Sequence, residues 1–213
     1  MRTDFKLPLV LVALALAVFV QATPAAAVEF TDRQLERLKA GKTVKKPLST
    51  VGEGGVYGGS GFALVDAPPE VVWQAILDWE SYHTVFPRTR ETREVSQRGD
   101  RSLVRVVMGY ALVNIEFFVK IRTDKSKWQM DFELAENRPH DIEAARGYWR
   151  LFPQPGGQTL VAYVTAVKVP MGVVNLIPES LEKKINRNLL ACPKFLREWL
   201  EGAGASRYRP AKS

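Results

Sequence analysis

Cysteine and histidine are almost absent from this chain. Of its 213 residues one is a cysteine, Cys192, and two are histidines, His83 and His140. A lone cysteine cannot form a disulfide within the chain, and a zinc site built on thiolates needs several of them. Cys192 falls at an apolar position of a predicted helix, which favours a buried structural thiol over a nucleophile. The sequence therefore predicts no metal site and no bound cofactor.

Common catalytic motifs are missing as well. The sequence contains no G-x-S-x-G elbow, no H-E-x-x-H pair and no other paired metal-ligand spacing. His140 stands in a polar turn, where we expect it to be exposed, and spacing gives His83 no partner that would make it a general base. We assign no catalytic residue, and binding is favoured over catalysis.

Long basic runs are also lacking, although the net charge is +7. The densest clusters are the pairs Lys45-Lys46 and Lys183-Lys184, and acidic residues lie close to the second pair. Proteins that bind nucleic acid carry a dense basic stripe. We therefore expect no nucleic-acid partner. The charge is read as a mild basic bias that favours solubility, with an anionic membrane surface as the alternative partner.

One long apolar run stands at the start of the chain. Residues 7–20 are apolar throughout, follow the basic residues Arg2 and Lys6, and precede three alanines that end at Ala27. This order is typical of a secretory signal peptide. The run is shorter than the about 20 residues that a membrane-spanning helix needs, although an uncleaved anchor is the alternative. We predict cleavage of residues 1–27 after Ala27 and an exported protein, periplasmic or secreted.

Residues 28–57 predict a short helix and a glycine-rich linker. Thr31 and Gln34 stand at the two positions of a helix capping box. The stretch GEGGVYGGSG at residues 52–61 lacks the lysine and hydroxyl that end a phosphate-binding loop. We interpret it as a flexible approach to the first strand.

Hydrophobic periodicity changes twice along the rest of the chain. A strand at residues 62–65 precedes two short helices, and period-two alternation then runs to residue 169. Strands are predicted at residues 90–96, 103–110, 113–122, 128–134, 147–152 and 159–169. A final helix carries one apolar stripe from Leu181 to Trp199, with a kink expected at Pro193. Residues 203–213 are predicted to be a flexible basic tail.

The order of these elements indicates an α+β fold. Strands joined by hairpins form an antiparallel sheet, and its apolar face needs a cover. The only predicted element long enough is the C-terminal helix. We expect a curved antiparallel sheet of about seven strands wrapped around that helix.

Several stretches resemble the START-like superfamily, which includes polyketide cyclase/dehydrase, coenzyme Q-binding and birch-pollen-allergen-type proteins. They are Ala67–Trp73 (APPEVVW), the Trp79 to Pro87 stretch, Gly147–Leu151 (GYWRL) and the apolar residues 169–178 before the last helix. The resemblance covers about residues 58–202. It implies a helix-grip fold with a hydrophobic ligand in an internal cavity, and it leaves the ligand unspecified.

The predicted ligand contacts come from alternating strand positions and from the helix stripe. They are Val113, Ile115, Phe117, Trp128, Met130, Phe132, Tyr163, Leu181, Ile185 and Leu189. The same residues would equally suit a packed core without a cavity. Tyr163, Glu143, Asn114 and His83 are the candidates for orienting a polar group of the ligand.

An apolar loop at residues 170–178 predicts a gate or a contact with a membrane surface. The predicted gate residues are Phe86, Met171, Val173, Val174, Leu176 and Ile177. A loop folded over its own cavity edge is the alternative.

The sequence thus favours an exported, monomeric protein that binds or carries a lipid or other hydrophobic small molecule. A cyclase or dehydrase acting on a hydrophobic substrate is the second hypothesis. An interaction role in the cell envelope without any ligand is the third.

Overall fold

A computed structural model of the chain describes residues 29–49, 51–110, 113–175 and 179–208. The predicted signal peptide lies outside these residues. Among the described residues, no helix is long and apolar enough to cross a membrane.

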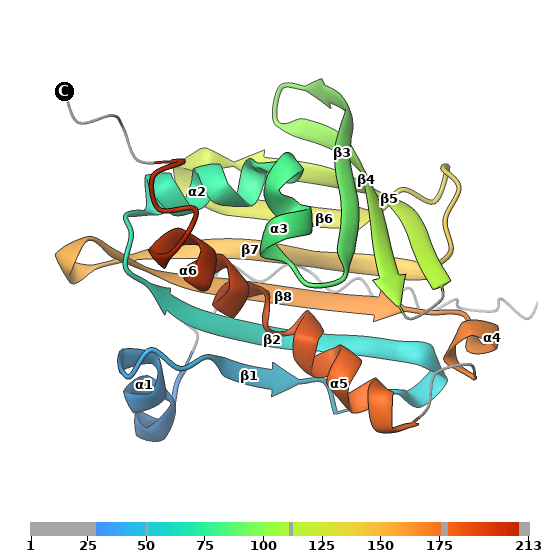
Figure 1. Ribbon diagram of the computed structural model, residues 1–213, viewed down its shortest axis with the longest axis horizontal. Helices are drawn as coiled ribbons and strands as arrows, with labels where there is room; N and C mark the ends of the chain where they lie inside the picture. Colours follow the sequence, from blue (N-terminus) through green and yellow to red (C-terminus); the bar gives the residue numbers. More distant parts are fainter. Residues whose placement is uncertain (1–28, 50, 111–112, 176–178, 209–213) are drawn as a thin grey trace, which may run out of the picture. The chain divides into compact units, whose positions relative to one another are not determined.

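Eight antiparallel strands form one sheet in the order β1-β2-β8-β7-β6-β5-β4-β3. The strands are β1 (Val44–Pro47), β2 (Val56–Val65), β3 (Thr89–Arg98), β4 (Arg101–Tyr110), β5 (Val113–Asp124), β6 (Gln129–Leu134), β7 (Ala144–Gln154) and β8 (Gln158–Lys168). Figure 1 shows β3, β4 and β5 turning across the direction of β7 and β8, so that the sheet curves around the helices on one face. The fold class is confirmed, with β1 as the strand that the sequence did not predict.

Most of the glycine-rich stretch belongs to a strand: residues 56–61 lie in β2, and Glu53–Gly55 form a 3-10 helix before it. Residues 56–65 pair with β8 on one side, and residues 59–62 pair with β1 on the other. A Cβ on Gly61 would lie 2.2 Å from the Leu190 carbonyl oxygen, so only glycine allows the helical segment to approach this closely. The Gly58 amide donates a hydrogen bond of 2.7 Å to Oδ1 of Asn186, a buried residue of that segment. The glycines are therefore docking positions, which alternation of apolar residues cannot reveal.

The helices are α1 (Asp32–Lys39), α2 (Pro69–Leu77), α3 (Tyr82–Val85), α4 (Met171–Val174), α5 (Glu179–Leu189) and α6 (Cys192–Glu201). Figure 1 shows α2, α3, α5 and α6 on one face of the sheet and α1 beside its β1 edge. The capping box predicted at Thr31 and Gln34 is present. The single C-terminal helix of the prediction is two helices, because Pro193 stands in the first turn of α6. Proline has no N–H to donate and its ring clashes with the preceding turn, so the helix restarts there.

The end of the described chain is anchored, although a flexible tail was expected from residue 203. Tyr208 is buried, and its hydroxyl donates to Oδ2 of Asp78 at 2.8 Å while Arg207 donates to the same oxygen at 2.7 Å. Burial would raise the pKa of Asp78, but hydrogen bonds from Arg207, Tyr208 and Ser81 outweigh it and hold that pKa below its ordinary value. Residues 209–213 lie outside the described residues.

Buried apolar side chains form two clusters on the helix side of the sheet. The main cluster lies under α2, α3 and α6 and includes Val72, Ile76, Met130, Trp149 and Leu196. The second cluster consists of Tyr57, Ile115, Leu134, Ile142, Ala145, Val169 and Val174, with α4 beside it. The region between these clusters is where the candidate site lies.

Candidate functional site

The inner face of the sheet is unevenly covered by helices. Helix α6 packs on β2 and β8, α2 packs on β7 and β8, and α3 packs on β3. In the middle, Phe117 of β5 and Phe132 of β6 point to the same side as the main cluster but stay only half-buried. Phe117 contacts both clusters, so it lies between them.

Helix residues face this region from the other side. Leu189, near the end of α5, packs against the second cluster, and Cys192, at the start of α6, packs against the main cluster. Both side chains are half-buried, as is Ile185 one turn before Leu189. We call the set Phe117, Phe132, Leu189 and Cys192 the inner site. It offers apolar surface from the sheet and from the helices that core packing leaves partly uncovered.

The environment of Cys192 is apolar and poorly hydrated. Burial is the largest influence on its thiol and raises the pKa to about 12, although a hydrogen bond with the Tyr163 side chain acts in the opposite direction. The thiol is therefore neutral at physiological pH, as expected for a structural cysteine.

Several predicted ligand contacts lie in the packed core instead. Met130 and Tyr163 are buried in the main cluster, and Ile115 is buried in the second. Trp128 precedes β6 in the left-handed conformation, with φ 51°, and its ring meets Trp73 of α2 edge to face at 5.8 Å. The side chains of Val113 and Leu181 lie outside the described set. Of the predicted contacts, Phe117, Phe132 and Leu189 belong to the inner site, whereas Ile185 is half-buried on α5 and packs against neither cluster.

Phe86 is part of an aromatic stack and does not lie across an entrance. Its ring centroid is 4.7 Å from that of Tyr82 and 6.1 Å from that of Trp149. Trp149 in turn contacts Tyr163, which stacks on Phe132 at 6.1 Å. Phe86, Trp149 and Tyr163 are buried, and α3 packs against β3 at that edge of the sheet. Phe86 therefore supports the wall that ends at Phe132.

The predicted apolar loop contains the short helix α4. Val174 is buried and Val173 half-buried against the second cluster, whereas Met171 is 47% exposed. Leu176 and Ile177 lie outside the described residues. Beside α4 is a groove of about 460 Å³, which we call the α4 groove, lined by Asn114, Ile115, His140, Asp141, Ile142, Glu143, Pro170 and Val173.

The carboxylates of the α4 groove are engaged in structural contacts. Glu143 forms an ion pair of 2.7 Å with Lys168, and Oδ2 of Asp141 accepts a hydrogen bond of 2.8 Å from the Glu116 amide. Asn114 and His140 are exposed at its edge, while His83 is exposed on α3. Among the described residues, no group of three or more His, Cys, Asp and Glu residues is arranged to hold a metal ion.

Two buried hydroxyls of the inner face were not found by sequence reasoning. The hydroxyl of Tyr57 and Oγ1 of Thr165 have no hydrogen-bond partner within the described part of the chain. Burial raises the pKa of Tyr57, with a smaller contribution from Glu182 on α5. Tyr57 escaped notice because it stands within the glycine-rich stretch that was interpreted as a linker.

The curved antiparallel sheet, the helices on its inner face and the apolar site between them define the START-like class of proteins. Within this class, the chain belongs to the family described as polyketide cyclase / dehydrase and lipid transport, whose sequence pattern matches residues 65–192. The predicted resemblance is confirmed by this match. No curated protein matches the sequence.

Solved structures share the fold at low sequence identity. The Zhui aromatase/cyclase from a Streptomyces species has a TM-score of 0.55 and 19% identity, over 70% of this chain and 98% of that one. A STAR-related lipid transfer protein from Xanthomonas axonopodis has a TM-score of 0.55 and 14% identity, over 74% and 98%. A START superfamily protein from Mycobacterium smegmatis has a TM-score of 0.53 and 16% identity, over 69% and 96%. These likenesses concern the fold alone.

Proposed function

We propose that this protein binds a lipid or other hydrophobic small molecule in the inner site and carries it outside the cytoplasm. The observation that carries the proposal is the half-buried state of Phe117, Phe132 and Leu189, which lie between the sheet and the helices. In a filled core such side chains would be fully covered, because protein interiors pack as densely as organic crystals.

The chemistry of the inner site favours an apolar ligand. Each 100 Å² of ligand surface removed from water contributes about 2.5 kcal/mol. Cys192 is the one polar member of the set, and its thiol is neutral. An acyl chain or a fused-ring molecule would therefore be held by its shape and area, with no charged contact.

The α4 groove is the proposed mouth of the site. It adjoins the second cluster, which the inner site also contacts through Phe117 and Leu189. Met171, 47% exposed on α4, is available to touch a membrane surface during ligand exchange. Asn114 stands at the groove edge, where a polar head of the ligand would emerge.

Export is the second part of the proposal, and it depends on residues 1–27. Expression of the full chain in a bacterial host, followed by fractionation and intact-mass measurement, tests it. We expect a periplasmic product that begins after Ala27. A full-length product in the membrane fraction would contradict cleavage.

Native mass spectrometry of the purified mature protein tests ligand binding. We expect a mass increase that disappears after extraction with organic solvent, with a lipid or apolar compound in the extract. A protein that carries no ligand and takes up no fluorescent fatty acid or polycyclic probe would refute the carrier proposal.

Two neighbouring leucines provide a matched pair of variants for the same question. Leu189 is half-buried at the inner site, whereas Leu190 is 1% exposed in the packed interior. Leu189→Trp should fill free space, abolish ligand uptake and leave the unfolding free energy within about 1 kcal/mol of the wild type. Leu190→Trp should lower that free energy by about 2–3 kcal/mol, because the larger ring has no room. Equal destabilisation by both substitutions would mean that the inner site is filled.

Cyclase or dehydrase chemistry is the second candidate, because the α4 groove brings His140 beside the proposed mouth. Both carboxylates of that groove already have partners, which leaves the imidazole without an acidic residue to orient it. We expect His140→Ala to retain ligand binding and stability. Turnover of an aromatic polyketide precursor that is lost in His140→Ala, with folding intact, would favour the enzyme instead.

A further inference from the structure

A second groove lies outside the region that the family pattern matches. It has a volume of about 700 Å³ and runs between α1, β1 and α6. Its lining residues are Thr31, Arg33, Gln34, Arg37, Gly41, Lys42, Thr43, Val44, Lys45, Lys194 and Arg197. All of these positions fall before residue 65 or after residue 192, so this groove, called the basic groove below, is not part of the shared domain.

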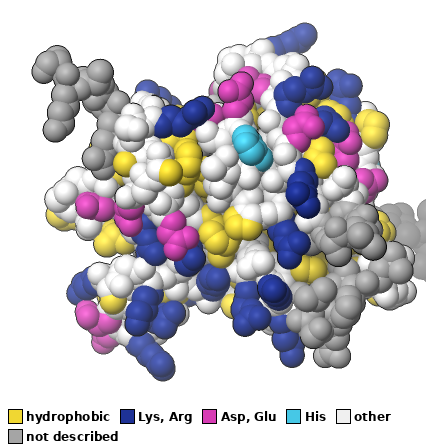
Figure 2. All heavy atoms as spheres, viewed as in Figure 1, with side chains coloured by type: hydrophobic (Ala, Val, Ile, Leu, Met, Phe, Trp, Pro, Cys, Tyr) yellow, Lys and Arg dark blue, Asp and Glu magenta, His cyan; other side chains and the backbone are white. Residues whose placement is uncertain are grey.

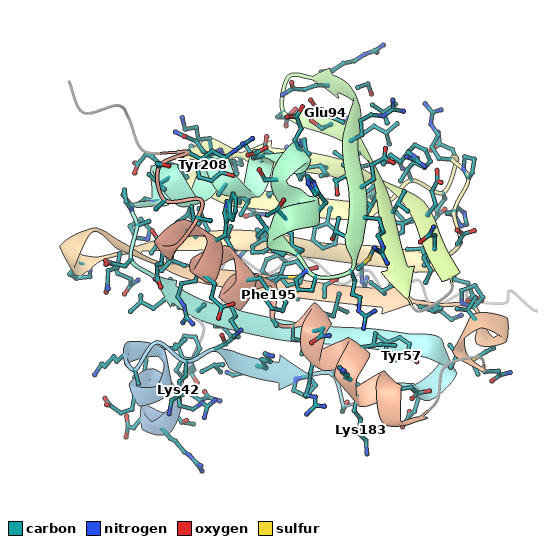
Figure 3. All side chains as sticks on the ribbon, in the orientation of Figure 1. Lys42, Tyr57, Glu94, Lys183, Phe195 and Tyr208 are labelled. Atoms are coloured by element: carbon teal, nitrogen blue, oxygen red, sulfur yellow. The ribbon has the colours of Figure 1, made fainter. Side chains whose placement is uncertain are left out.

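Six of the lining residues are lysine or arginine, and none of the described lining residues is acidic. Figure 2 shows Lys and Arg side chains gathered over the part of the face where α1 and β1 lie in Figure 1, and Figure 3 labels Lys42 there. Such a concentration of one sign of charge in a concavity focuses the electrostatic potential and attracts anions.

Acidic neighbours offset only part of this charge. Lys194 pairs with Glu198 at 2.8 Å, and Arg197 lies 3.7 Å from Glu201, both within α6. The carboxylates belong to the same helix as their partners and do not line the groove. The cations contributed by α1 and β1 therefore dominate the groove.

The walls are fixed by hydrogen bonds to main-chain carbonyl groups. Arg197 donates to the Gly41 carbonyl oxygen, Arg37 donates to that of Thr43 at 3.4 Å, and Lys45 donates to that of Arg187 at 2.9 Å. These bonds join α6, α1, β1 and the end of α5. These three cationic side chains are therefore held in place before any ligand arrives, which lowers the entropic cost of binding.

Two features of the groove favour an anionic ligand. Oγ1 of Thr43 is buried and has no hydrogen-bond partner within the described part of the chain. The pKa of Lys45 lies below its ordinary value, because of burial first and the nearby charges of Lys194 and Arg187 second. An anion in the groove would relieve this repulsion and offer an acceptor to the hydroxyl.

We propose that the basic groove binds a phosphate-bearing group, with Arg33, Arg37, Lys42 and Lys45 as its cationic contacts. The planar guanidinium group of arginine can donate two parallel hydrogen bonds to phosphate oxygens, and lysine ammonium groups add positive charge around them. The group belongs either to the head of an anionic phospholipid at a membrane surface or to a soluble phosphorylated molecule. The proposal does not depend on ligand binding in the inner site.

The test variant is the double substitution Arg33→Gln/Lys42→Gln. Both side chains line the groove, are exposed and form no ion pair among the described residues. The matched control is Arg93→Gln/Arg98→Gln on β3, which removes the same charge from exposed positions at the opposite edge of the sheet. Because all four side chains are exposed, both variants should fold like the wild type, which thermal unfolding verifies.

The assay uses vesicles of phosphatidylcholine with or without phosphatidylglycerol in a sedimentation experiment at low salt, and pyrophosphate in a calorimetric titration. A basic residue near an anionic membrane contributes roughly fivefold to affinity, so the groove variant should lose about 30-fold. The control variant should lose much less, and added salt should weaken the wild type by screening.

The two probes distinguish the sources of the phosphate. A phospholipid head group is assigned if the wild type binds vesicles but not pyrophosphate, and if only the groove variant, not the control variant, loses vesicle binding. Pyrophosphate binding that the groove variant loses assigns a soluble phosphorylated ligand. The proposal is overturned if neither probe binds the wild type, or if both double variants lose affinity equally.

Discussion

Two buried threonines of β8 allow the energetic value of a hydrogen bond to be tested within one strand. Thr159 has no exposed surface, and its hydroxyl donates to the Ala67 carbonyl oxygen at 2.7 Å. Thr165 is 2% exposed, and its hydroxyl has no partner within the described part of the chain. Replacement by valine changes each hydroxyl into a methyl group of similar size.

The two substitutions should change stability in opposite directions. In Thr159→Val the Ala67 carbonyl group loses its donor inside the protein, which costs about 1–3 kcal/mol. In Thr165→Val an unpaired buried hydroxyl disappears, and relief of its desolvation contributes about 1 kcal/mol in favour of the folded state. The unfolding free energies of the two variants should therefore differ by about 2–4 kcal/mol.

Urea unfolding of ligand-free protein, followed by tryptophan fluorescence, measures this difference. With a slope of about 2 kcal/mol per molar urea, the two midpoints should lie about 1–2 M apart, on either side of the wild type. A fall in stability for Thr165→Val as large as that for Thr159→Val would refute the reasoning, since it would mean that the Thr165 hydroxyl has a partner.

Three further outcomes follow from the packing. Because the pKa of Asp78 is lowered in the folded state, wild type should be more stable than Asp78→Asn above about pH 4. This difference should disappear as the pH falls through the folded-state pKa, and urea midpoints measured from pH 7 to pH 3 test it. Cys192, with its pKa raised to about 12, should react with a thiol reagent at pH 8 much more slowly in the native than in the unfolded protein, because little thiolate is present, and equal rates would contradict the raised pKa. Gly61→Ala should lower the thermal midpoint by several degrees through its clash with the Leu190 carbonyl oxygen, whereas Gly172→Ala, with open space around its Cβ and no positive φ, should cost less.

The alternation of apolar and polar residues along the sequence predicted most strands of the sheet. The residues from 89 to 168 read as strands because their apolar positions recur with a period of two, and the six strands found there start and end within a few residues of the predicted bounds. The capping box of α1 was equally visible, since it depends on two side chains three positions apart. Such patterns involve only residues close together in the sequence, so they can be recognised without knowledge of the fold.

The glycine-rich half of β2 and strand β1 were not predictable in this way. Glycine carries no side chain whose alternation could be read, and β1 is four residues long. Their strand conformation depends on pairing with β8 and on the approach of the α5–α6 segment to Gly61. The division of the last helix at Pro193 was foreseen as a kink, but whether the helix bends or restarts depends on what packs around it.

Within the candidate site, the sequence identified which residues face inward and the structure determined which of them remain uncovered. Phe132 and Met130 are equivalent in the alternation of β6, yet Met130 is 2% exposed and Phe132 is half-buried. The difference arises because α2 and α6 cover one part of the sheet and leave another. The basic groove was likewise invisible, because its cations come from segments about 150 positions apart in the chain.

The sequence by itself determined the class of the fold, the apolar character of the inner face and the family to which the chain belongs. The first two follow from periodicity and local residue chemistry, and the family follows from the resemblance of several short stretches to known proteins. Only the tertiary structure decided where apolar surface stays accessible and where positive charge accumulates. Both depend on how curvature and helix docking bring distant segments together, and no short stretch of sequence contains that information.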